Sequence, residues 1–146
     1  TQGITQARDI WATAGPAQRE PLQVGCLVPV HCARTRQDAI EQMREYEERY
    51  FKLLANFFAP RNAEEAEQRK LGGGIPWWEE PATWETAYNG RMVICGDPDD
   101  CIRELQQYEQ AGVTMLQGVF QIGGMTYPMV MESLRLFAEE VIPNLV

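Results

Sequence analysis

The sequence predicts an α/β fold in which parallel strands alternate with helices. Three observations support this prediction: apolar strand patterns alternate with amphipathic helix patterns, a strand–cap–helix unit recurs, and the first strand pattern is apolar on both faces. The expected order is helix, strand, helix, irregular excursion, short strand, helix, strand and helix. Strands that are joined through helices in this way run parallel and have right-handed crossovers.

The first part of the chain contains two expected helices on either side of one strand. Gln6–Ala14 is a short helix candidate that stops before a Gly-Pro pair. The run Leu22–Ala33 (LQVGCLVPVHCA) is typical of a strand that is covered on both faces. Thr35 then begins a form of capping box with Asp38, and the helix after it is expected to run to about Phe58. The apolar stripe of this helix contains Ile40, Met43, Tyr50, Leu54 and Phe57.

The regular pattern is interrupted between about residues 60 and 90. This stretch is charged at first and then reads LGGGIPWWEEPATW, with three glycines, two prolines and three tryptophans. A flexible linker seldom contains clustered Trp, so we interpret the stretch as a long excursion from the fold.

The pattern of strand and helix resumes with the run RMVIC, a short strand candidate. Asp97 is expected to cap the next helix, which has a proline at its first position and Gly112 just after its end. Val113–Ile122 is the last strand candidate. A final helix is expected to open at Thr126 and to end at Pro143.

Charge and composition restrict the classes of partner. The formal net charge is −8 and the pI is about 4.7, which disfavours binding to nucleic acid. There is neither a basic amphipathic stretch for an anionic membrane surface nor an apolar run long enough to span a bilayer. The four cysteines lie in apolar patterns without a Cys-x-x-Cys spacing, beside a single histidine. We therefore expect reduced thiols, a cytoplasmic location and no metal site.

The segment from Cys95 to Leu145 combines three distinctive features. It has a G-x-P helix start, an A-G-[VI] turn before the last strand, and a closing helix of the form S-[ML]-x-L-F-x-x-x-V-x-P. In this combination the segment resembles the C-terminal end of the bacterial luciferase-like monooxygenases. The matching residues are Gly96, Pro98, Cys101, Ala111, Gly112, Ser133, Leu136, Phe137, Val141 and Pro143.

The resemblance implies that the chain is the C-terminal portion of a (β/α)8 TIM barrel and is incomplete on its own. Val24–Cys32 and Val113–Ile122 would be strands seven and eight of that barrel. Pro98–Ala111 and Tyr127–Ile142 would be the helices that follow them. Residues 1–146 would then be one part of a barrel, and the excursion would form a lid on the catalytic face.

The same resemblance implies a reduced flavin as cofactor, either FMN or the deazaflavin F420, and a small organic substrate. Most flavin contacts and the principal catalytic histidine of the family come from earlier strands. A missing N-terminal part would therefore carry most catalytic residues, and this chain alone is not expected to catalyse the reaction. The alternative is a non-catalytic barrel remnant that acts as a structural subunit, because its strand edges would otherwise be exposed. Expected partners are thus a complementary N-terminal polypeptide or further copies of the chain in a homo-oligomer.

Gly123 and Gly124 lie between the last strand and the final helix. They could cradle a phosphate at the start of that helix, but no cation follows them, and a compact turn is the favoured interpretation. On the catalytic face of a barrel, the two glycines and Gln121 could still line the cofactor pocket.

Four further residues are candidates for contact with ligands. His31 ends the first strand and could act as a general acid or base, although a packed or hydrogen-bonded imidazole is the favoured interpretation. Trp77, Trp78 and Trp84 could stack on a flavin or substrate, or bind an aromatic ligand without redox chemistry. For these tryptophans, packing against the protein or a partner is the favoured interpretation.

Overall fold

The sheet has three parallel strands in the order β2-β1-β3. A computed structural model describes residues 9–13, 22–71 and 82–145 of the chain. In the central strand β1 (Gly25–Cys32), residues 25–29 pair with β3 (Met115–Val119) and residues 30–32 pair with β2 (Ile94–Gly96). Both pairings are parallel, which confirms the α/β prediction. β3 is shorter than the expected Val113–Ile122, and its ladder ends at Pro29, a residue that has no N–H to donate.

Helices connect the strands and follow the last of them. They are α2 (Arg36–Phe57), α3 (Ala63–Leu71), α4 (Trp84–Asn89), α5 (Pro98–Gln110) and α6 (Tyr127–Leu136). α6 continues through a π-helical turn (Phe137–Val141) and a 3₁₀ turn (Ile142–Asn144). Residues 9–13 are also helical, within the range expected for the first helix.

The expected capping residues begin two of these helices. The Thr35 hydroxyl accepts a hydrogen bond from the Asp38 backbone N–H at 3.1 Å, and the Asp97 carboxylate accepts one from the Asp100 backbone N–H at 2.9 Å. Gly112 follows α5 with a φ of 92°, a left-handed conformation that glycine adopts without steric cost. The boundaries of α2 and α5 therefore follow from local sequence.

Two helices lie within the stretch that the sequence predicts to be irregular. α3 begins where the Asn62 side chain accepts a hydrogen bond from the Glu65 N–H at 2.9 Å, and α4 begins with a capping box between Thr83 and Thr86. The prediction was wrong at these places because side-chain caps stabilise short helices whose apolar periodicity is weak. Residues 72–81 of the excursion lie outside the described residues.

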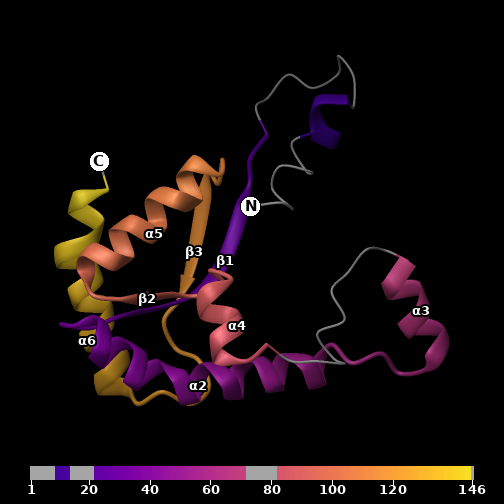
Figure 1. Cartoon of the computed structure of the whole chain (residues 1–146), viewed down its shortest axis with the longest axis horizontal. Coiled ribbons are helices and arrows are strands. Elements are labelled where there is room, and N and C mark those ends of the chain that lie inside the picture. Colours follow the sequence, from indigo (N-terminus) through magenta and orange to yellow (C-terminus); the bar gives the residue numbers. More distant parts are fainter. Residues whose placement is uncertain (1–8, 14–21, 72–81, 146) are drawn as a thin grey trace.

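The buried face of α2 lies beside the predicted stripe, and four residues of that stripe (Ile40, Met43, Tyr50 and Leu54) are buried in the core or packed against it. Its buried residues are spaced by four and are Ala39, Met43, Glu47, Phe51 and Ala55. From the predicted stripe Met43 is buried, while Phe57 is 78% exposed. The prediction was wrong at Phe57 because the end of α2 extends past the strands against which the helix packs (Figure 1).

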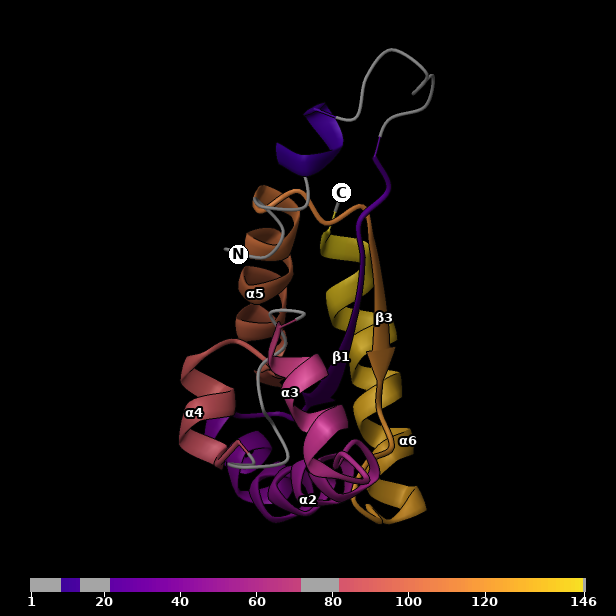
Figure 2. The same cartoon turned by 90° about the vertical axis from the view of Figure 1, so that its right-hand side faces the viewer.

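The two faces of the sheet pack against different helices. On one face, Val28, Val30 and Ile94 form a core with residues of α5 and α6 such as Cys101 and Leu136. The opposite face carries Cys95, which belongs to a second core together with residues of α2 and α4. Figures 1 and 2 show α5 and α6 alongside the strands and α2 across the carboxyl ends of β1 and β3. α2 therefore lies at the edge of the sheet where parallel-barrel enzymes build their active sites.

Part of this second face has no cover from the described residues. Leu27 of β1 is 59% exposed and Met115 of β3 is 65% exposed. The register pairs Gly25 with Met115 and Leu27 with Gln117, so both apolar side chains lie on the same face. The outer edges of β2 and β3 also lack a neighbouring strand within the described residues. The sheet is thus open where a complete barrel would continue.

Candidate functional site

The carboxyl ends of β1 and β2 bring a histidine and a cysteine together beneath α2. His31 and Cys95 are register partners on neighbouring strands, so their side chains project from the same face. The His31 Nε2 atom lies 2.9 Å from the Gln42 Oε1 atom of α2, and the imidazole is 1% exposed. Burial lowers the pKa of His31, although the hydrogen bond with Gln42 opposes this shift. The imidazole is therefore neutral near pH 7, and its buried Nδ1 atom has no hydrogen-bond partner among the described residues.

Glu47 is a second buried polar group beneath the same helix. Its side chain is fully buried, and within the part of the chain that the structure describes neither carboxylate oxygen has a hydrogen-bond partner. Burial raises its pKa to about 7, and the neighbouring charge of Glu48 adds to the shift. This residue was not among those predicted from the sequence, although its spacing of four from both Met43 and Phe51 places it on the buried side of α2.

The Gly123–Gly124 turn packs directly against α2. Both glycines have positive φ angles, 57° and 87°. A Cβ atom on Gly123 would lie 2.1 Å from the Tyr46 carbonyl oxygen, so only glycine fits at that position. The Arg49 guanidinium of α2 donates a hydrogen bond to the Gly123 carbonyl at 3.0 Å. Arg49 of α2 is therefore the cation that the local sequence of the turn lacks. Gln121 is exposed beside the turn.

Trp84 lies inside the protein at the start of α4. Its side chain is buried, its ring stacks on Tyr88 with centroids 5.0 Å apart, and the Arg44 guanidinium lies 5.9 Å from its ring centroid. These contacts favour the packing interpretation of Trp84 over stacking with a ligand. Trp77 and Trp78 lie outside the described residues.

A cleft of about 290 Å³ opens at the end of β1, between the first turns of α2 and α6. Gln42 and Ser133 line it from opposite helices. The Ser133 hydroxyl accepts a hydrogen bond from the Cys32 N–H at 2.8 Å, which ties α6 to β1. Because Gln42 also contacts His31, the cleft is one hydrogen bond away from the buried imidazole. Gln42 and Ser133 could not be predicted as lining residues from the sequence, because the tertiary contact between the two helices creates the cleft.

The four cysteines are free thiols, and three of them (Cys32, Cys95 and Cys101) are buried. Burial raises the pKa of the Cys95 thiol. A hydrogen bond with Cys32, together with burial, raises the pKa of the Cys101 thiol. Such thiols stay protonated and are poor nucleophiles, so they act as small apolar residues of the core.

Two kinds of site are absent from the described part of the chain. No cluster of three or more His, Cys, Asp or Glu side chains there is arranged to hold a metal ion. Among the described helices, none has both the length and the apolar character that a membrane crossing requires.

Residues 2–115 match the luciferase-like monooxygenase family. The chain belongs to this family. The match includes β1, α2, the excursion and α5, and it ends at the first residue of β3. Of the ten residues on which the resemblance rested, those from α5 and its two ends lie within the match, whereas those of the closing helix from Ser133 lie beyond it. The five within the match are Gly96, Pro98, Cys101, Ala111 and Gly112.

Solved structures with a similar fold are also monooxygenases. The monooxygenase RslO1 from Streptomyces bottropensis superposes with a TM-score of 0.62 at 16% sequence identity. A second structure is the oxygenating constituent of 3,6-diketocamphane monooxygenase from Pseudomonas putida, a type II Baeyer–Villiger enzyme in complex with FMN. It superposes with a TM-score of 0.64 at 19% sequence identity. The alignments cover 99% of this chain but only 37% and 40% of those two chains. The chain thus has the fold of a portion of a (β/α)8 barrel. No curated protein matches its sequence.

Proposed function

We propose that this chain is the C-terminal part of a flavin-dependent luciferase-like monooxygenase, in which it closes the barrel and supplies a lid. The observation that carries the proposal is the position of α2 across the carboxyl ends of the parallel strands, where barrel enzymes bind their substrates (Figure 1). The family match and the partial coverage of the solved structures support it.

In this proposal β1 and β3 are strands seven and eight of the barrel, and α5 and α6 are the helices that follow them. The segment between β1 and α5 would be the lid, with α2 as its base. The uncovered face around Leu27 and Met115 would point into the barrel and pack against side chains of the earlier strands. An N-terminal part of the enzyme, which carries those strands, would be the principal partner.

The cofactor in this proposal is a reduced flavin, FMN or F420, and FMN is the first choice for a test because a structural relative binds it. When bound, a reduced flavin supplies the electrons that activate oxygen for insertion into a small organic substrate. Gln121 and Gly124 are exposed on the turn after β3. Of the described residues, a Cβ atom on Gly124 would meet only Arg49, at 3.6 Å, so this backbone is open to a planar ring. The need for glycine at position 123 is already explained by the close contact of Gly123 with α2.

The chain's own residues would position and protect the reacting groups. α2 would exclude water from the open end of the barrel, which strengthens electrostatic interactions inside it. His31 is the acid–base candidate, because its neutral imidazole has a free acceptor at Nδ1 and a link to the cleft through Gln42. The other catalytic residues would come from the N-terminal part.

The proposal is tested by mixing the chain with a polypeptide that carries the preceding strands of the barrel. The expected result is an FMN absorption band that co-purifies with the pair but not with this chain alone. Leu27→Asp should prevent reassembly because it places a charge on the face that becomes buried. The control Leu53→Asp, at an exposed site on α2, should leave it intact. A reassembled pair that retains neither FMN nor F420 would contradict the proposal.

The exposed apolar face also supports a second candidate, a structural subunit that self-associates. Two copies could bury Leu27 and Met115 against each other or pair the open strand edges. Light scattering coupled to size-exclusion chromatography separates the candidates. A monomer at all accessible concentrations would eliminate self-association, and a dimer that does not dissociate in the presence of the N-terminal part would favour it.

A cytoplasmic location is part of the same proposal. The four free thiols support it, because buried cysteine pairs in oxidising compartments are usually joined as disulfides. Expression with and without an oxidising environment, followed by thiol titration, tests this part. When protein isolated in its native form is then unfolded, four titratable thiols are expected.

A further inference from the structure

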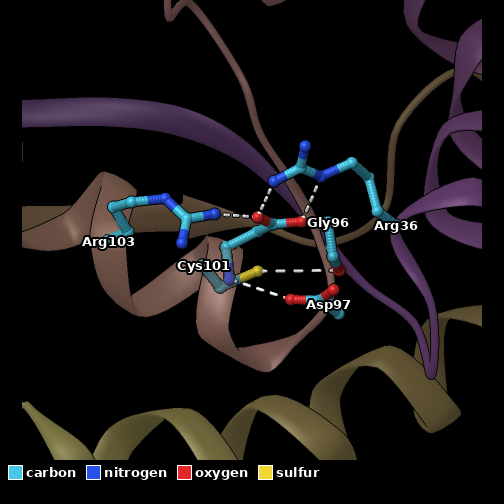
Figure 3. Close-up of polar contacts among 6 residues, drawn as sticks. Arg36, Gly96, Asp97, Cys101 and Arg103 are labelled. Carbon is cyan, nitrogen blue, oxygen red and sulfur yellow. Dashed lines mark hydrogen bonds and ion pairs between the residues drawn. The ribbon is translucent and has the colours of Figure 1, made fainter.

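Asp100 holds two arginines from different parts of the chain. The Arg36 Nε atom at the start of α2 donates to Asp100 Oδ2 at 2.6 Å, and Arg36 Nη2 and Arg103 Nη2 both contact Asp100 Oδ1. Figure 3 shows the two guanidinium groups converging from opposite sides onto the start of α5. The hydrogen bonds from Arg36 lower the pKa of Asp100, so the carboxylate is ionised at neutral pH. One negative charge therefore faces two positive charges.

The carboxylate is held in place by the strand behind it. A Cβ atom on Gly96, the last residue of β2, would lie 2.4 Å from the Asp100 Cβ atom. The Asp100 side chain is 7% exposed, whereas those of Arg36 and Arg103 are more than half exposed. The anion is thus fixed inside the protein, and much of each guanidinium remains open to solvent.

Asp100 and its two arginines line a cleft with a volume of about 260 Å³. A third arginine, Arg91, lines this cleft too. Arg91 precedes β2 and has a φ of 56°, an uncommon conformation for a side-chain-bearing residue. The Tyr108 hydroxyl donates to the Arg91 carbonyl at 2.5 Å and helps to hold this backbone. The Arg91 Nε atom lies 3.8 Å from Glu104 Oε2, which is beyond hydrogen-bond distance.

The charges in the cleft do not balance. Among the side chains that line the cleft, three guanidiniums (Arg36, Arg91 and Arg103) face two carboxylates (Asp100 and Glu104), and the Asp97 carboxylate, which does not line the cleft, also attracts Arg36. The whole chain, by contrast, has a formal charge of −8. Each guanidinium has five N–H donors, and the contacts described for these three arginines use only a few of them. Tyr88 and Asn89 line the same cleft and add a hydroxyl and an amide.

We propose that this cleft binds an oxyanion of the phosphate class, either inorganic phosphate or the terminal phosphate of a larger ligand. Planar guanidinium groups donate paired hydrogen bonds that match the geometry of phosphate oxygens. The volume accommodates a phosphate group and a few attached atoms, but it is smaller than most pockets that enclose a whole cofactor. Arg91 is available to the ligand because its contact with Glu104 is long. This proposal does not depend on flavin chemistry.

The first test is a titration of the full 146-residue chain with inorganic phosphate at constant ionic strength, followed through the arginine Nε–H signals in NMR spectra. Saturable shifts of the Arg36, Arg91 and Arg103 signals are expected. Arg91→Gln and Arg103→Gln should each weaken binding at least tenfold. Arg135→Gln is the matched control, because Arg135 is similarly exposed and lies 3.8 Å from Glu132. Equal shifts at Arg135, or no saturation, would overturn the proposal.

The source of the phosphate is distinguished by two further titrations, with FMN and with riboflavin, which lacks the phosphate. Competition between FMN and inorganic phosphate, with no effect of riboflavin, would assign the site to a phosphate ester. Binding of inorganic phosphate alone would assign it to a small free anion. If Arg103→Gln disturbs folding, as judged by the backbone amide spectrum, Arg91→Gln still decides the question, because Arg91 makes no hydrogen bond to Asp100 in the structure. Unchanged phosphate affinity in a folded Arg91→Gln protein would overturn the proposal.

Discussion

Gly123 and Tyr46 lie in direct backbone contact, although 77 positions separate them in sequence. A Cβ atom at position 123 would approach the Tyr46 carbonyl oxygen to 2.1 Å, far inside any normal contact distance. This contact joins the turn after β3 to the middle of α2. It explains why the first of the two glycines is required, and it fixes α2 across the carboxyl ends of the strands.

Gly123→Ala is therefore expected to destabilise the chain by about 3 kcal/mol, from the strain of a positive φ together with a steric clash. Gly124→Ala is the matched control. It has the same kind of backbone strain at a φ of 87°, but its Cβ atom would meet only Arg49, at 3.6 Å, so a loss of about 1 kcal/mol is expected. Urea unfolding of both variants measures the difference, and equal losses would show that the contact with Tyr46 is unimportant.

Glu47 should make the stability of the chain depend on pH. Its pKa is about 7 in the folded protein against an ordinary value of 4.5. Between these two pH values the folded state therefore binds a proton that the unfolded state has already lost. The stabilisation is complete below pH 4.5, declines as the pH rises toward 7, and is lost above it, by about 3 kcal/mol in all. Chemical unfolding at a series of pH values measures this slope.

Glu47→Gln is expected to remove that decline. It should leave the opposite dependence that His31 produces, because the lowered pKa of the imidazole contributes stability above about pH 6.5 that is lost as the pH falls. The titratable groups that interact electrostatically with Glu47 are Glu48 on its own helix and the Cys95 thiol of β2. A Glu47→Gln protein with an unchanged slope between pH 4.5 and 7 would refute the assignment.

Arg36 and Arg34 provide a comparison of two ion pairs near the start of α2. Arg36 binds a carboxylate that is 7% exposed, whereas Arg34 pairs at 3.0 Å with Glu140, whose side chain is 45% exposed. Arg36→Gln should cost about 1–2 kcal/mol, because it removes charged hydrogen bonds from a buried acceptor. Arg34→Gln should cost at most about 0.5 kcal/mol, as is usual for surface pairs. Thermal unfolding under identical conditions tests the order of the two effects.

The open face of the sheet should control association. Leu27→Ser and Met115→Ser are expected to reduce self-association of the isolated chain without loss of folding, because both side chains are mostly exposed. Leu53→Ser, at an equally exposed site on α2, should have no such effect. Sedimentation velocity of the three variants provides the measurement. Association that is unaffected by all three would place the contact on another surface.

Much of the fold was predictable because its signals are local. Thr35, Asp97 and Gly112 mark the ends of helices through hydrogen bonds or backbone angles that involve only near neighbours. The alternation of strands and helices predicted parallel pairing, which the register of β1 with β2 and β3 confirms. The short helices α3 and α4 were missed because side-chain caps, rather than apolar periodicity, define them.

The candidate site was predictable only in part. His31 and the glycine pair could be selected by residue type, but their partners Gln42, Tyr46 and Arg49 all come from α2. Glu47 looked like one of many surface acids of a charged helix. Its burial depends on which side of α2 faces the sheet. The predicted apolar stripe was misplaced by a residue or two, so it did not indicate that Glu47 is buried.

The sequence by itself determined the order of the strands and of the long helices α2, α5 and α6, the caps that begin α2 and α5, and the relationship to the luciferase-like family, since each depends on contiguous residues. Only the tertiary structure decided that α2 crosses the ends of the strands, that Asp100 gathers Arg36 and Arg103, and that the sheet stays open at Leu27. The physical reason is that packing is set by contacts between residues far apart in the chain, which local patterns do not encode.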